Sequence, residues 1–269
     1  MENRVHATVN NFIAEVILNR PEARNAISRE MWESLTAQLR ELECDPNVQV
    51  VIITGAGAHA FSAGADFADL ASAANDLAQI DPILKAIEET MSTIEQMSKP
   101  VIAKVNGAAI GGGCELATAC DLRIAADTAK FGIPAGHMGI AITWQDTRRL
   151  AALVGGGWAR DLLMTGRILD ADTACRIGLV TRVVPAADLD RAAEELAGTV
   201  AKMSANTLKA AKQYTLAVAQ GHELASADEG LVLAREAWGS QDFQRRVKAA
   251  LEQRSAVAMP MPVEGGGNR

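Results

Sequence analysis

The stretch from Val101 to Ala119 reads VIAKVNGAAIGGGCELATA, and its order of residue types decides the fold class. The β-branched run at 101–105 predicts a buried strand that ends at Asn106-Gly107. A glycine-rich turn follows at 107–113, and the apolar run at 116–120 predicts a helix. A strand, a tight turn and a helix in this order favour an α/β protein with parallel strands.

The same alternation of strand and helix recurs on both sides of this stretch. Apolar residues alternate over 5–18 and predict a β-hairpin that turns at Asn10-Asn11. Short apolar runs at 48–54 and 122–126 predict further buried strands. The helical spacing of apolar residues at 28–42 and 80–97 predicts amphipathic helices.

From about Thr143 onward the pattern is nearly all helical, with one short strand at 180–184. We place a soft boundary near residue 190, between an α/β part at 1–190 and a helical part at 191–269. The composition of 260–269, with Pro and Gly-Gly-Gly, predicts a disordered tail. The candidate helices cover 145–154, 157–165, 171–177, 187–201, 204–220, 222–237 and 240–251.

Composition excludes several classes of function. The net charge of −7 argues against binding of a nucleic-acid backbone, which needs a basic face. There is no apolar run of about 18 residues and no apolar leader, so we expect no membrane segment and a cytoplasmic location. The four cysteines form no C-x-x-C pair and the four histidines form no cluster, so we expect no metal site. Only 4% of residues are aromatic, so the core must consist largely of closely packed small side chains.

Two short motifs suggest other enzymes, and their context argues against both. The segment 55–60 fits G-x-G-x-x-A, but a dinucleotide site also needs a helix that starts inside the motif. The segment 60–64 differs by one residue from the G-x-S-x-G turn of hydrolases, with Ser62 as nucleophile. The downstream histidines, His137 and His222, do not lie in a loop after a late strand, as a catalytic triad would require.

Two glycine-rich turns, at 62–66 and 107–115, each precede a helical pattern. Small residues let a ligand approach the backbone, and the first turn of a helix leaves N–H groups free. Two such turns side by side could direct two N–H donors at one oxygen, as in an oxyanion hole. The alternative is that these glycines only permit tight packing.

Glu115 is the charged residue in the first turn of the otherwise apolar helix predicted after the second glycine-rich turn. A carboxylate on an apolar helix, close to open N–H groups, is a candidate general base. The alternative is a glutamate that only compensates the helix dipole.

An ordered set of motifs over about residues 5–190 resembles the enoyl-CoA hydratase/isomerase (crotonase) superfamily. The resemblance implies a crotonase-like spiral of ββα turns and a C-terminal helical region for oligomerisation, as a homotrimer or a dimer of trimers. The matching motifs are NRPEARNA at 19–26, AFSAGAD at 60–66, VNG at 105–107, GGGCELA at 111–117, CDLRIA at 120–125, FGIP at 131–134, TGR at 165–167 and GLV at 178–180.

The resemblance also implies an acyl-CoA substrate, a role in fatty acid metabolism and no further cofactor, because coenzyme A is part of the substrate. By position, the thioester oxygen would be held by the N–H groups of Ala65 and Gly112, with Glu115 as the acid/base. Residues expected to line the substrate site are Ala23, Arg24, Ala26, Ala63, Gly64, Asp66, Phe67, Gly111, Pro134, Ala135 and Trp144.

The chain departs from the hydratase pattern at Ala135, where hydratases of this family carry a second glutamate. Bulky and polar residues at 143–150 also replace glycines that are common in the family. Three hypotheses follow. Glu115 acts alone; or Asp146, His137 or Thr143 supplies the missing group; or the chain is an isomerase, hydrolase or lyase of the same fold, or a catalytically silent acyl-CoA-binding protein.

Overall fold

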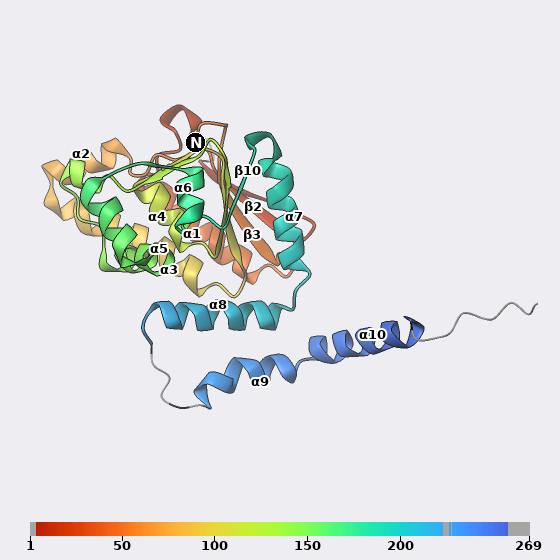
Figure 1. The fold of residues 1–269 in the computed structure, drawn as a ribbon. Coiled ribbons are helices and arrows are strands. Elements are labelled where there is room, and N and C mark those ends of the chain that lie inside the picture. The colour runs from red at the N-terminus through yellow and green to blue at the C-terminus, as the bar shows by residue number, and fades with distance from the viewer. Residues whose placement is uncertain (1–3, 223–225, 227, 258–269) are drawn as a thin grey trace, which may run out of the picture. The chain divides into compact units, whose positions relative to one another are not determined.

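The computed structural model describes residues 4–222, 226 and 228–257, and the chain divides into two compact units at residues 223 and 224. The first unit contains two sheets and the helices packed against them (Figure 1). The boundary expected near residue 190 falls inside this first unit, at the start of α7 (Leu189–Ala201).

The larger sheet of the first unit has the strand order β1-β2-β3-β5-β7-β10. β1 and β2 pair antiparallel as the predicted hairpin, and the other neighbours pair parallel, as the strand–helix alternation predicted. The hairpin turn lies one residue later than predicted, because Asn11 and Phe12 hold the two positive φ angles that such a turn requires. The strands are β1 (Val5–Asn10), β2 (Ile13–Leu18), β3 (Val50–Gly55), β5 (Val101–Val105), β7 (Leu122–Ala126) and β10 (Arg182–Val184).

The smaller sheet has the order β4-β6-β8-β9, and its β4, β6 and β8 are the second strands of three repeated units. Along the chain, β3, β5 and β7 are each followed by a strand of this sheet and then by a helix. This succession is the expected spiral of ββα turns. The strands are β4 (Ala60–Ser62), β6 (Ala108–Ile110), β8 (Lys130–Gly132) and β9 (Leu169–Asp170).

Helices cover both faces of the larger sheet. On one face, α7 packs Ala193 and Ala197 against Ile52 and Ile102. On the other face, a larger core includes the fully buried Trp32 and many alanines, consistent with the low aromatic content. The further helices of the first unit are α1 (Arg29–Cys44), α2 (Phe67–Asn75), α3 (Ile80–Gln96), α4 (Gly112–Ala119), α5 (Trp144–Thr165), α6 (Ala171–Arg176) and α8 (Ala205–Ala219).

Helix α5 corresponds to two predicted helices, 145–154 and 157–165, which meet at a break. Gly155 there has φ 74° and ψ 157°, values outside the helical region. The positive φ favours glycine because it has no β-carbon. The break at Gly155 thus falls in the gap that the sequence pattern predicts between 154 and 157.

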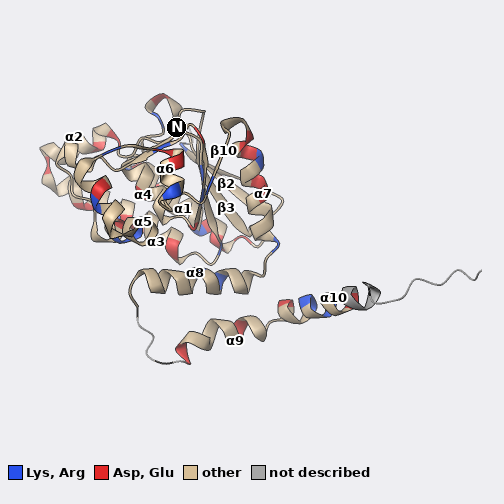
Figure 2. Cartoon of the chain, in the orientation of Figure 1, with Lys and Arg blue, Asp and Glu red and all other residues tan. Residues whose placement is uncertain are grey.

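The second unit contains the 3₁₀ turn Glu229–Leu231, α9 (Val232–Trp238) and α10 (Gln241–Val257). The helix predicted at 222–237 is therefore shorter, and part of it, like the predicted tail at 260–269, lies outside the described residues. Acidic and basic residues recur along α10 (Figure 2). Each helix in the described part of the chain is too short or too polar to cross a membrane.

Candidate active site

The two glycine-rich turns meet where β4 leads into α2 and β6 leads into α4. A β-carbon on Gly64 would lie 2.6 Å from the carbonyl oxygen of Ile110 and 3.0 Å from the amide nitrogen of Gly112. A β-carbon on Gly113 would lie 2.4 Å from the carbonyl oxygen of Ser62. These distances leave no room for a side chain at either glycine. The backbones of the two turns are therefore in direct contact.

The backbone amides of Ala65 and Gly112 have no acceptor within the described part of the chain, and the same holds for Gly113 and Cys114 in the first turn of α4. The neighbouring Gly111 is different, because its N–H donates to Gly132 at 2.8 Å. Gly112 is the first residue of α4, where an amide has no partner inside the helix. A β-carbon on Gly112 would lie 3.9 Å from the nitrogen of Ala65, so the two open donors are close together.

Glu115 lies in the first turn of α4 and is buried, with 8% of its surface exposed. Among the described residues its carboxyl group has neither a hydrogen-bond partner nor an ion-pair partner. Burial raises the pKa of Glu115 to about 8, Asp146 adds to this rise, and Arg149 opposes it. Both protonation states are therefore accessible near neutral pH, as a group that takes and returns a proton requires.

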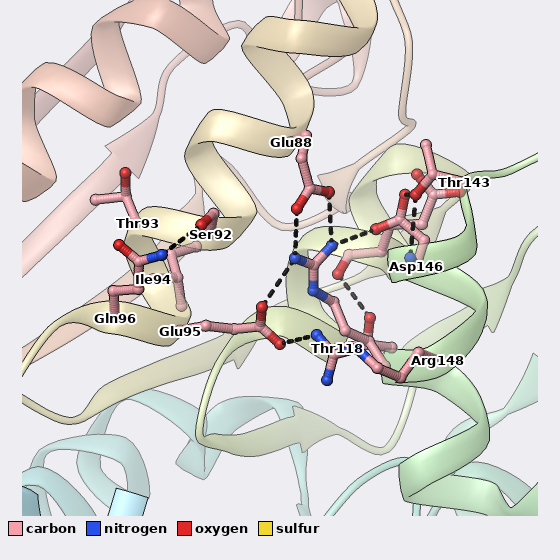
Figure 3. A network of polar contacts seen from close by, with 12 residues as sticks. Glu88, Ser92, Thr93, Ile94, Glu95, Gln96, Thr118, Thr143, Asp146 and Arg148 are labelled. Atoms are coloured by element: carbon pink, nitrogen blue, oxygen red, sulfur yellow. Dashed lines mark hydrogen bonds and ion pairs between the residues drawn. The ribbon is translucent and has the colours of Figure 1, made fainter. Parts of the chain in front are cut away.

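Asp146 is buried in the first turn of α5, which packs against α4. Its Oδ1 accepts a hydrogen bond from Nη1 of Arg149 at 2.9 Å, and its Oδ2 accepts one from Oγ1 of Thr143 at 2.6 Å (Figure 3). Thr143 is the N-cap of α5 and accepts from the Asp146 amide at 3.1 Å. Both oxygens of the Asp146 carboxylate are thus engaged, in contrast to those of Glu115.

Ala135 is the position where the resemblance implied a second glutamate, and the described segment 131–142 around it contains no Asp or Glu. Ala135 begins the 3₁₀ turn Ala135–Met138 and packs its methyl group partly against the core. His137 is exposed, and its Nε2 would lie 2.8 Å from a β-carbon on Gly166. Trp144, the first residue of α5, is 76% exposed. Pro134, the N-cap of the 3₁₀ turn, is partly buried.

The segment 23–27 lies alongside the first glycine-rich turn. Ala63 donates its N–H to the carbonyl of Arg24 at 2.9 Å, and Ile27 donates to the carbonyl of Gly64 at 2.8 Å. Ala23 is partly buried, Ala26 is buried and Arg24 is exposed. The tertiary structure therefore brings the expected CoA-binding segment beside the open amide of Ala65.

Asp66 and Phe67 form the start of α2 at the same edge. Asp66 caps the helix by accepting from the amide of Ala68 at 2.7 Å, and it forms an ion pair with Arg20. Burial opposes ionisation of Asp66, but the bonds from Arg20 and Ala68 outweigh it and lower the pKa of Asp66. Phe67 is 74% exposed, so its ring contributes a large apolar surface beside the site.

Asn25 lies in the motif at 19–26, but its structural role in the site was not predicted from the sequence. Its side chain is fully buried and donates to the carbonyls of Ala56 at 3.0 Å and Ala60 at 2.8 Å, and it accepts from the amide of Arg20 at 3.0 Å. Its φ is 55°, a left-handed value that Asn tolerates better than most residues. An Asn among small residues in a turn was the available signal.

The contexts of the two rejected motifs agree with their rejection. The segment 55–60 leads into strand β4 and not into a helix, which removes the dinucleotide interpretation. Ser62 is fully buried, and its hydroxyl accepts from the amide of Gly64 at 3.1 Å. A nucleophilic serine has to be exposed at its turn.

A separate cavity of 890 Å³ lies between the hairpin and α7. Its buried cation, Lys104, is already paired with Glu15 at 2.5 Å and with Asp190 at 2.6 Å. Among the described residues, no group of three or more His, Cys, Asp or Glu side chains is placed to hold a metal ion. The pair of open amides beside Glu115 is therefore the best candidate for chemistry.

The ββα spiral, with its open turns over a buried glutamate, defines a crotonase-like protein. The chain belongs to the enoyl-CoA hydratase/isomerase family, whose model matches residues 8–257.

Similar proteins of this family span nearly the same length. A probable enoyl-CoA hydratase of Mycobacterium bovis is 40% identical, over 89% of this chain and 91% of that protein. The short-chain-enoyl-CoA hydratase of Clostridium acetobutylicum is 36% identical, over 96% and 95%. The crystal structure of an enoyl-CoA hydratase from Bacillus anthracis superposes with a TM-score of 0.83 at 34% identity, covering 93% of this chain and 96% of that chain.

Proposed function

We propose that this chain hydrates the double bond of an enoyl-CoA thioester. One observation carries the proposal: two unbonded backbone amides, of Ala65 and Gly112, lie beside a buried glutamate whose carboxyl group has no partner among the described residues. The family and the hydratase names of its relatives support this choice of reaction.

In the proposed mechanism, the amides of Ala65 and Gly112 hold the thioester oxygen. When a nucleophile adds at the β-carbon, negative charge moves onto this oxygen as an enolate forms. Donors fixed in place stabilise the charged oxygen more than the neutral thioester, and each is worth about 3–4 kcal/mol in the transition state. The N-terminus of α4 adds positive potential at the same point.

Glu115 moves the proton in the proposed hydration. Its carboxylate takes a proton from water as the water oxygen bonds to the β-carbon, and the carboxylic acid then returns a proton to the α-carbon. The net change is the addition of one water, and Glu115 ends in its starting form. A pKa near 8 suits both halves of this cycle.

The turn at 23–26 is proposed to bind coenzyme A, and its exposed residue, Arg24, is proposed to meet a phosphate group. The remaining residues of the proposed substrate site lie in the two glycine-rich turns and around Ala135. The proposal needs no cofactor besides the coenzyme A of the substrate. It also includes a cytoplasmic homotrimer or dimer of trimers, formed through the C-terminal helices.

A second candidate is isomerisation of the double bond, and Ala135 favours it. Neither the methyl group of Ala135 nor the engaged carboxylate of Asp146 offers a second free base. A single carboxylate can move a proton between the γ- and α-carbons of an enoyl thioester without using water.

Turnover of crotonyl-CoA and longer enoyl-CoAs tests the proposal. Hydration removes the absorbance of the conjugated thioester, whereas isomerisation of a 3-enoyl-CoA creates it. We expect Glu115→Gln to reduce hydration by about 100-fold or more. Glu41→Gln, at an exposed position of α1, is the matched control and should retain full activity.

Three results would contradict the proposed hydration. Full activity of Glu115→Gln would remove Glu115 as the acid/base. A wild-type protein that binds acyl-CoA without turnover would be a binding protein. Release of free coenzyme A thiol would indicate a hydrolase, and its persistence in Ser62→Ala would exclude Ser62 as the nucleophile.

A further inference from the structure

Arg149 forms a buried clamp between α5 and α3. Its guanidinium is 2% exposed and donates to both carboxylate oxygens of Glu88, at 3.0 and 3.1 Å (Figure 3). It also donates to Glu95 at 2.9 Å and to Asp146 at 2.9 Å. Glu95 in turn accepts from Arg148 at 2.8 Å. The position of the Asp146 carboxylate is thus fixed by a network that spans two helices.

This network carries an excess of negative charge. The three carboxylates of Glu88, Glu95 and Asp146 face the two guanidiniums of Arg148 and Arg149. The positive charge of Arg149 is shared among all three carboxylates, so it cannot serve as a dedicated counter-ion for Glu115. Within the described part of the chain, Glu115 therefore has a buried carboxylate nearby and no cation of its own.

Among the other elements around α4, β7 contributes the buried Arg123, which donates to the carbonyls of Ala117 and Cys120 towards the C-terminal end of the helix. Strands β4 and β6 consist of uncharged residues at 60–62 and 108–110. On α4 itself, the neighbouring Cys114 is fully buried, and burial raises the pKa of its thiol to about 12. The charged groups that face Glu115 are thus Asp146 and Arg149 from α5, with Glu88 and Glu95 of α3 behind Arg149.

We propose that Asp146 is a positioning residue whose clamped negative charge adds to the effect of burial and makes Glu115 a stronger base. This inference rests on the proposed role of Glu115 as the acid/base. The inferred role of Asp146 is through Glu115 and not on the reacting atoms, since Asp146 is 2% exposed and both of its oxygens accept bonds from Arg149 and Thr143. Its charge strengthens the Glu115 carboxylate as a base, so that Glu115 takes the proton from water, and the acid then formed protonates the α-carbon.

The test is a carboxyl NMR titration of the full chain labelled with ¹³C-glutamate, without substrate. The Glu115 signal is assigned by its absence in Glu115→Gln. We expect Asp146→Asn to lower the pKa of Glu115 by about one unit, the usual effect of removing one neighbouring charge. Because the proposed hydration starts from the Glu115 carboxylate, the acidic limb of kcat/KM for crotonyl-CoA should move to lower pH by the same amount.

A matched control and a second variant keep this test decisive. Asp188→Asn removes a carboxylate from an exposed pair with Arg191 of the same i,i+3 spacing, and it should leave Glu115 unchanged. If Asp146→Asn fails to fold, Glu88→Gln replaces it, since its side chain is 34% exposed. Loss of Glu88 leaves Arg149 less compensated, so the pKa of Glu115 should again fall.

An unchanged or higher pKa of Glu115 in the folded variants would overturn the inference. The titration distinguishes this failure from failure of the proposed function, because it uses no substrate. Lowered pKa values in a protein that hydrates no enoyl-CoA would leave the inference standing and remove the hydratase. Normal hydration by the wild type, together with a Glu115 pKa that Asp146→Asn does not change, would remove the inference and leave the proposed function standing.

Discussion

The buried side-chain amide of Asn25 donates a hydrogen bond to the carbonyl of Ala60 at 2.8 Å and thereby joins two segments of the site that are 35 residues apart. The same amide holds Ala56, and its oxygen holds Arg20. One side chain thus anchors the turn at 23–27 against the strand that leads to Ala65.

We expect Asn25→Ala to destabilise the fold by about 2–4 kcal/mol, because buried carbonyls lose their donor and Ala disfavours the left-handed backbone. Urea unfolding measures this loss. Asn47→Ala, at an exposed position, should change stability by less than about 0.5 kcal/mol. Equal effects of the two substitutions would contradict the anchoring role.

Gly64→Ala should destabilise the protein by about 2–4 kcal/mol and reduce binding of acyl-CoA. The φ of Gly64 is 91°, and the added methyl group would press on Ile110 and the Gly112 amide. Thermal unfolding and acyl-CoA titration measure the two effects. Gly157→Ala, in open space on α5, should instead stabilise the helix by up to about 1 kcal/mol. Unaltered binding by Gly64→Ala would argue against an oxygen site at this turn.

Glu115 should make stability depend on pH. Its pKa is about 8 in the folded protein, against 4.5 for a glutamate in water, so the folded state binds more protons between these values. The contribution of Glu115 is therefore fully present below about pH 4.5 and is lost as the pH rises to 8. We expect Glu115→Gln to gain about 2 kcal/mol or more over the wild type between pH 5 and pH 9.

Denaturant unfolding at both pH values measures this difference, with Glu41→Gln as the exposed control. A gap between wild type and Glu115→Gln that stays constant with pH would show that Glu115 is not shifted in the folded state.

Ala135→Glu should raise hydration of crotonyl-CoA by about tenfold or more, because a second carboxylate can share the work of deprotonating water. The rate of absorbance loss measures this gain. Ala141→Glu, at an exposed position in the loop before α5, is the control for the added charge. A folded Ala135→Glu protein with no gain would indicate that position 135 does not face the reacting water.

The sequence alone determined the alternation of strands and helices and the position of the break in α5. Strand runs, glycine turns and helical spacing are local patterns, and the structure confirms the α/β class with parallel strands that they predicted. The hairpin turn shifted by one residue, because the choice between neighbouring turn positions depends on backbone twist and not on composition. The motifs also identified the family correctly.

Only the tertiary structure decided the electrostatic setting of Glu115. Composition marks Asp146 as a candidate acid, but hydrogen bonds from Arg149 and Thr143 engage both of its oxygens. Glu88 and Glu95, which compensate Arg149, lie more than 50 residues away along the chain. The protonation of a buried group depends on the distances to all neighbouring charges and on the exclusion of water, and no local sequence pattern contains either quantity.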